Sequence, residues 1–168
     1  MKAKGLIPAA CVACLVALPA LATLTEAPGQ PTVTVNADTS VVFSWTAPPT
    51  ELPVKYSVDV EGTASFSYTD PASGLPVDGE LTVEASFGTS DYNPEDMDAT
   101  EMTVPWADFI AAIAESLADQ GIPVENLIGF ELEATAKVKG LDPGKGKGRQ
   151  NNPWSPGSDP FTVSYTAP

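Results

Sequence analysis

The chain has 168 residues, of which 22 are acidic and 8 basic, with no histidine and two cysteines, and its net charge is −14 at pH 7. Both cysteines, Cys11 and Cys14, lie within the first 14 residues. The rest of the chain therefore lacks the residues for disulfides, Cys or His zinc sites, cysteine nucleophiles and Ser-His-Asp triads. Nucleic acid is also disfavoured as a partner, because a polyanion needs a basic footprint.

Residues 1–22 have the pattern of a secretory signal peptide. Two lysines precede an apolar stretch from Leu6 to Leu18, and Ala20-Leu21-Ala22 supplies the small-x-small motif that signal peptidase cleaves after. We expect cleavage before Thr23, and export of the mature chain to the cell surface or the medium.

Two other interpretations of this leader stay open. An uncleaved anchor would use residues 6–22, which are at the lower length limit for a spanning helix. A lipoprotein would need a lipidated cysteine, and neither Cys11 nor Cys14 lies in a good lipobox. Such an N-terminal anchor is the one membrane attachment that the sequence offers.

The mature chain is more acidic than the whole. Without residues 1–22 it has six basic residues against 22 acidic ones, a net charge of about −16. Residues 23–30 lack periodicity and are expected to form a flexible tether. Residues 31–168 are expected to form a single domain, large enough to be held by its core without disulfides.

Alternation of apolar and polar residues dominates this domain and predicts strands with one wet face. Strands are expected at 31–36, 40–46, 54–61, 80–87, 130–139 and 161–165, with weaker candidates at 65–69 and 100–104. Clusters of proline, glycine and aspartate between them are typical of turns. Several short one-sided strands of this kind predict an antiparallel β-sandwich.

One segment has helical spacing instead. Its apolar residues are Trp106, Phe109, Ile110, Ile113 and Leu117. Pro105 suits the first helical position and Gly121 the terminating left-handed one, so a helix is expected at about 105–120. Its apolar stripe favours a helix that caps an open end of the sandwich core. A partner-binding helix is the alternative, and it requires an exposed stripe.

With its strands in this order, the chain resembles a fibronectin type III domain. The residues that carry the resemblance are the entry strand Pro31-x-Val33-x-Val35, Trp45 of strand B, the pair Pro48-Pro49, Tyr56 of strand C, Phe130 to Ala136 of strand F, and Trp154-Ser155-x-x-Ser158 before strand G. The resemblance covers about 31–61 and 129–166. It implies an immunoglobulin-like or fibronectin-III-like sandwich with a non-catalytic binding or spacer role and no cofactor. Phe130 departs from the family, which usually keeps a tyrosine at that corner.

A second resemblance is to the amino-terminal module of starch-utilisation outer-membrane lipoproteins. A threonine-containing strand, a short helix and a long strand run in the same order there. Here residues 100–104, 106–117 and 130–139 follow that order. This likeness also implies a surface binding or spacer role without catalysis.

Two features of the C-terminal part are candidates for partner binding. Lys145, Lys147 and Arg149 are separated by single residues and hold half of the mature positive charge, so they suit an anionic partner. The alternative is a flexible loop kept soluble by charge. Trp154 lies between two prolines and can stack on a sugar ring or a partner surface, or lie flat across strand F.

The acidic segment 91–101 offers oxygen ligands for calcium, but Asp96 and Met102 stand where an EF-hand needs glycine and glutamate. A solvated loop is the simpler interpretation. No carboxylate pair is placed in a concave site, so we expect no enzyme activity.

The leading hypothesis is therefore an exported binding or spacer module with an unknown protein or glycan partner. The alternatives are a carbohydrate-binding accessory protein of a polysaccharide-uptake system and a structural subunit. The subunit would assemble by edge-strand pairing through residues 23–30 or 160–166.

Overall fold

The computed structural model describes residues 24, 26–37, 39–50, 52–141 and 153–167. The protein is mainly β. Its elements are β1 (Thr32–Asn36), β2 (Ser40–Ser44), β3 (Lys55–Thr69), β4 (Pro76–Gly88), α1 (Thr89–Tyr92), β5 (Glu101–Pro105), α2 (Trp106–Asp119), the 3-10 turn η1 (Val124–Asn126), β6 (Leu127–Leu141) and β7 (Phe161–Thr166).

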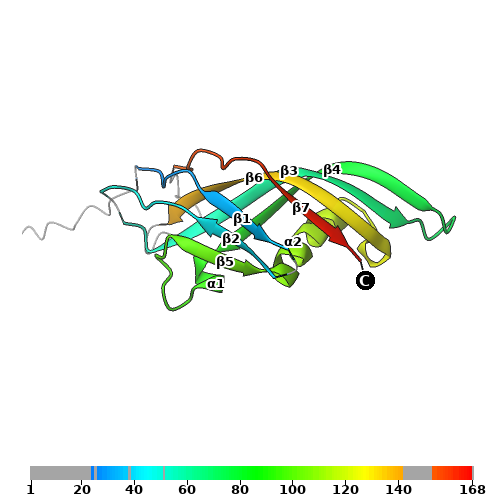
Figure 1. The fold of residues 1–168 in the computed structure, drawn as a ribbon, viewed down its shortest axis with the longest axis horizontal. Coiled ribbons are helices and arrows are strands. Elements are labelled where there is room, and N and C mark those ends of the chain that lie inside the picture. The colour runs from blue at the N-terminus through cyan, green and yellow to red at the C-terminus, as the bar shows by residue number, and fades with distance from the viewer. Residues whose placement is uncertain (1–23, 25, 38, 51, 142–152, 168) are drawn as a thin grey trace, which may run out of the picture.

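The strands form two antiparallel sheets of very different length. One has the order β1-β2-β5 and the other β4-β3-β6-β7. The five-residue strands of the first sheet span roughly 17 Å, whereas the 15-residue strands β3 and β6 span about 50 Å. The short sheet therefore covers only part of the long one, and α2 lies beside it over the next part (Figure 1).

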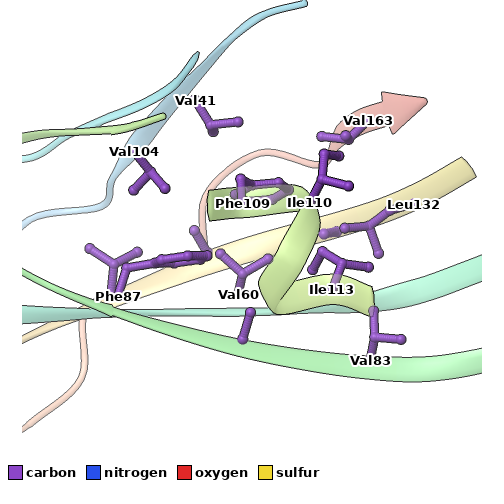
Figure 2. Close-up of a cluster of buried hydrophobic side chains, with 14 of the residues drawn as sticks. Val41, Val60, Val83, Phe87, Val104, Phe109, Ile110, Ile113, Leu132 and Val163 are labelled. Atoms are coloured by element: carbon purple, nitrogen blue, oxygen red, sulfur yellow. The ribbon is translucent and has the colours of Figure 1, made fainter. Parts of the chain in front are cut away.

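The core lies between the long sheet on one side and the short sheet with α2 on the other. Alternate residues of every strand point into it, as the sequence pattern predicts. Figure 2 shows Phe109, Ile110 and Ile113 of α2 gathered with side chains from both sheets. The Phe109 ring is stacked on Phe87 of β4, with centroids 5.5 Å apart. Each such buried side chain contributes about 1.5–3 kcal/mol.

The helix expected at about 105–120 is present as α2, one residue shorter at each end. Gly121 follows it with φ of +87°, the left-handed conformation that commonly ends a helix. Phe109, Ile113 and Leu117 are fully buried, so the interpretation of an exposed partner-binding stripe is wrong. The helix completes the core where the short sheet ends.

The β3 strand is longer than the sequence pattern indicates. Residues 54–61 and 65–69 were expected as two separate strands, but residues 55–69 form one continuous strand. Gly62 interrupts the apolar alternation between them. A Cβ at Gly62 would come within 2.2 Å of the Glu133 carbonyl oxygen, so this glycine allows β3 and β6 to approach closely.

The exposed edge of β4 is covered in its middle by α2. The Glu84 backbone N–H donates to the Ser116 hydroxyl at 3.2 Å, and the Gln120 side-chain amide donates to the Thr82 carbonyl at 2.8 Å. Both bonds use backbone groups that would otherwise be open to another strand. The end of α2 therefore protects this edge against pairing.

The segment expected as a flexible tether contacts the domain at several residues. Leu24 is 6% exposed, and the Gly29 N–H donates to the Thr46 carbonyl. The Glu26 carboxylate accepts hydrogen bonds from the backbone and hydroxyl of Thr50, at 3.0 and 2.7 Å. These contacts differ from those expected of a flexible tether, which would make none with the domain. They arise because Leu24 has apolar surface to bury and Glu26 finds two donors.

Across the described part of the chain, none of the helices has the length and apolarity to span a membrane. The leader, residues 1–22, lies outside the described residues, so its expected cleavage or anchoring stays a prediction.

Candidate functional site

The two candidate binding features of the sequence fare differently in the structure. Lys145, Lys147 and Arg149 fall within residues 142–152, outside the described residues, and their expected role stays a prediction. Trp154 is described and is 36% exposed. It lies two residues after this segment, next to side chains of the long sheet that point away from the core.

Trp154 is positioned by two serines that bind the edge of β6. The β7 strand pairs with β6 only from Gly129 to Ala134, which leaves the following residues of β6 without a strand on the edge that faces away from β3. Ser155 and Ser158 supply the missing partners. Residues 154–158 are called the serine strap below.

Each serine of the strap makes two hydrogen bonds to one residue of β6. The Ser155 N–H donates to the Val138 carbonyl at 2.8 Å, and the Val138 N–H donates to the Ser155 hydroxyl at 2.9 Å. Ser158 makes the same pair of bonds with Ala136, at 2.8 and 2.9 Å. Both serines are buried. A hydroxyl thus replaces the carbonyl of a neighbouring strand, which fixes the backbone at Trp154.

The indole of Trp154 lies beside β6 and remains partly open to solvent. Its backbone forms an isolated antiparallel bridge with Lys139, and the Lys139 Nζ lies 4.2 Å from the ring centroid. At an exposed position such a cation–π contact contributes about 0.5–1 kcal/mol. The Trp154 side chain thus packs against Lys139 of β6 and is partly exposed, and its expected role in binding stays a prediction.

A cavity of about 200 Å³ lies next to this indole. It is lined by Trp154, Thr135 and Lys137 from one side and by Asp59 and Glu61 from β3. The register of the sheet creates this set, because Lys137 is opposite Asp59 and Thr135 is opposite Glu61. The cavity therefore combines an aromatic ring, two carboxylates, an ammonium group and a hydroxyl.

The Asp59 carboxylate is held in place by its neighbours on the sheet. Its Oδ1 atom accepts a hydrogen bond of 2.7 Å from Ser86 on β4 and a longer one of 3.4 Å from Ser57. One oxygen is thus occupied, and no group of the described residues donates a hydrogen bond to the other. Asp59 can still accept a hydrogen bond from a molecule in the cavity.

The acidic segment 91–101 is held by hydrogen bonds from a buried threonine and an asparagine. Thr89 is fully buried, accepts a hydrogen bond from the Tyr56 N–H at 2.9 Å and donates to the carbonyl of Met97. The Asn93 side chain donates to the Glu101 carbonyl. Among the described residues no group of three Asp, Glu, His or Cys is arranged to hold a metal ion.

The shifted pKa values mark structural positions away from Trp154. Burial raises the pKa of Tyr56 and, less deeply in the core, of Tyr92. The Trp45 indole packs edge-on against the Tyr56 ring, with centroids 5.1 Å apart. The buried N–H of this indole lowers the pKa of Tyr56, against the larger effect of burial. The same N–H does not reach the geometry of a hydrogen bond with any described residue. The Ser73 hydroxyl and the Ala72 N–H lower the pKa of Asp70 in the β3–β4 turn.

No known family model matches this chain, and no curated protein is significantly similar to it. Its site must therefore be interpreted from its own residues.

Sequence reasoning identified Trp154 but not the residues around it. Asp59, Glu61, Thr135 and Lys137 all lie on the polar faces of strands that the alternation predicts. The signal that was missing is the register between β3 and β6, which places them together and depends on residues about 75 positions apart.

Proposed function

We propose that this chain is an exported, non-catalytic binding or spacer module with a fibronectin-III-like fold. The arrangement of the strands supports the fold assignment. In sandwiches of the immunoglobulin type, strands C, F and G lie in one sheet and strands A and B in the other. Here the segments that resemble C, F and G are β3, β6 and β7, which are neighbours in that order, and β1 and β2 pair in the opposite sheet.

The departures from that fold have local physical explanations. Phe130 is buried on β6 and packs against Tyr165 of β7 with centroids 5.4 Å apart. A ring-to-ring contact thus occupies the corner where the family uses a tyrosine hydroxyl. The added helix α2 lies where the long sheet extends beyond the short one, and it supplies the apolar surface that this overhang needs.

The observation that carries a binding role is the placement of Trp154. The serine strap fixes its backbone, yet 36% of the residue is exposed on a face that is otherwise polar. A rigid, amphipathic aromatic side chain loses little entropy when it binds, which is why such residues recur at interfaces. The basic residues at 145–149 come shortly before it in sequence and are expected to suit an anionic partner.

Export is tested by expressing the full chain in a bacterial host, fractionating the cells and measuring the mass of the recovered protein. The expected product starts at Thr23 and is found outside the cytoplasm. A chain that keeps residues 1–22 and stays in the cytoplasm contradicts the proposal. A full-length or lipidated product in the membrane fraction would show that the leader acts as one of the two anchors instead of being cleaved before Thr23. The proposed role at the cell surface would then still hold.

A carbohydrate-binding accessory role is the second candidate, and the cavity beside Trp154 favours it. Assembly by edge-strand pairing receives less support. Residues 26–30 contact the domain, and α2 occupies the edge of β4 at Thr82 and Glu84. The strand β7 remains the candidate for such pairing.

A further inference from the structure

The cavity beside Trp154 has side chains of both charges next to an aromatic ring, whereas two larger depressions of the described structure lack a basic residue. A shallow depression of about 750 Å³ near the far end of the long sheet has aromatic rings, carboxylates and hydroxyls in its lining but no lysine. A second depression, of about 550 Å³, lies between β4 and α2 and is lined by acidic and small residues. There, Ser116 and Gln120 are already engaged in bonds to the edge of β4.

We propose that the cavity beside Trp154 binds one sugar ring of an uncharged glycan. The ring would place its C–H face on the side of the indole that Lys139 does not cover, and its hydroxyls against Asp59, Glu61 and Lys137. The inference rests on the proposed function as a binding module, and it names the ligand class for that module.

The charges around the cavity select against ionic ligands. The two carboxylates are balanced by Lys137 in the lining and by Lys139, whose ammonium lies over the indole. A cationic ligand would meet these lysines at the ring, and an anionic ligand would meet Asp59 and Glu61 on a protein with net charge −14. An uncharged ligand avoids both repulsions.

The hydrogen-bonding groups of the cavity match sugar hydroxyls. A hydroxyl both donates and accepts, so it can donate to the carboxylates and accept from the Lys137 ammonium at the same time. Thr135 adds a group that can do either. Hydrogen bonds to charged groups are stronger than those between neutral groups. A few of them can therefore give measurable affinity over a small contact surface.

The size of the cavity fits one ring of a longer chain. Its volume of about 200 Å³ is below the roughly 300–1,000 Å³ of pockets that enclose a whole small-molecule ligand. Because it lies on an open sheet face, a polymer can continue in both directions over the neighbouring Ser, Thr, Asp and Glu side chains. One ring held this way predicts a Kd on the order of 1 mM, and several linked rings predict tighter binding.

The test uses the mature chain with neutral hexasaccharides of α-glucan, β-glucan, xylan and mannan, in calorimetry and in affinity electrophoresis on the matching polysaccharides. We expect at least one of them to bind. Acrylamide quenching gives an independent readout, since Trp154 is the most exposed of the three tryptophans and should be shielded by the bound sugar.

Substitutions separate stacking from general effects. Trp154→Ala should weaken binding at least about tenfold, and Glu61→Gln severalfold. Trp154→Phe should retain part of the affinity. The matched controls are Trp106→Phe, a tryptophan on α2, and Glu125→Gln, an exposed carboxylate on η1; both should bind as the wild type does. Circular dichroism verifies the fold, and Glu61→Gln and Trp154→Phe keep the test valid if Trp154→Ala does not fold.

Two results would overturn the inference: no neutral glycan binds with a Kd below about 10 mM, or binding is unchanged in all three cavity variants. Binding only to charged alginate or chitosan would refute the neutral class. If the chain is exported and processed but binds no glycan, the proposed module function survives without this ligand. If glycans bind and the chain stays unprocessed in the cytoplasm, the cavity assignment survives and the exported role fails.

Discussion

Removing one hydroxyl from the serine strap tests how this part of the fold is held. In Ser155→Ala the Val138 N–H loses its only acceptor among the described residues, and it is buried beneath the strap. An unsatisfied buried donor costs about 1–3 kcal/mol. For a domain of this size that cost lowers the midpoint of thermal unfolding by roughly 3–10 °C. The backbone bond from Ser155 to Val138 remains, which keeps the expected loss below complete unfolding.

Thermal and urea unfolding measure the global loss, and amide hydrogen exchange at Val138 and Ala136 measures the local one. Exchange at Val138 should accelerate in Ser155→Ala, and exchange at Ala136 in Ser158→Ala, because each amide loses its own acceptor. Ser164→Ala on β7 is the matched control, with an expected change within about 0.5 kcal/mol. If both strap variants unfold and exchange like this control, the hydroxyls do not hold the strap and the reasoning fails.

Three further substitutions test other parts of the structure by the same measurements. Thr89→Val removes the buried acceptor of the Tyr56 N–H and should cost about 1–3 kcal/mol in urea unfolding, while Thr89→Ser should restore most of it. Gly62→Ala places a methyl group against the Glu133 carbonyl and should lower the free energy of unfolding by about 1–3 kcal/mol. An unfolding midpoint equal to that of the wild type would contradict the close approach of β3 and β6. The pKa of Asp70 is lowered in the folded state, so its contribution to stability is present above the unfolded value of 3.8 and lost as pH falls through the folded value. Asp70→Asn should therefore be less stable than wild type at neutral pH and approach it in acid, and equal pH profiles would count against this hydrogen-bonded turn.

The strands were largely predictable because apolar alternation reports one buried face, and the helix because its stripe has a different period. The lengths of β3 and β4 were not. Gly62 and Gly79 interrupt the apolar alternation in the sequence, yet each lies within a strand where a neighbouring strand approaches closely. A Cβ at Gly79 would lie 2.7 Å from the Phe66 ring, so the glycine makes room for a cross-strand aromatic side chain.

The candidate site was predictable in one residue and unpredictable as a set. Trp154 is flanked by prolines, which marks it as a loop tryptophan with room to be exposed. Its neighbours Asp59 and Glu61 lie at alternate positions of a strand, like the other outward-facing acidic residues of the domain, so the sequence does not set them apart. Only the pairing of β3 with β6 distinguishes them, and that pairing is decided by packing across the whole sheet.

The same features that stabilise the long sheet also determine how it can bind. The serine strap occupies the edge of β6 beyond β7, and α2 occupies the edge of β4, so backbone groups at these places are already paired. Association through an added strand would have to displace them. The short sheet and α2 cover the inner face, which leaves the outer face of the long sheet open (Figure 1). Recognition by side chains on that face, with Trp154 at its β6 edge, is therefore the mode of binding that this architecture favours over strand addition.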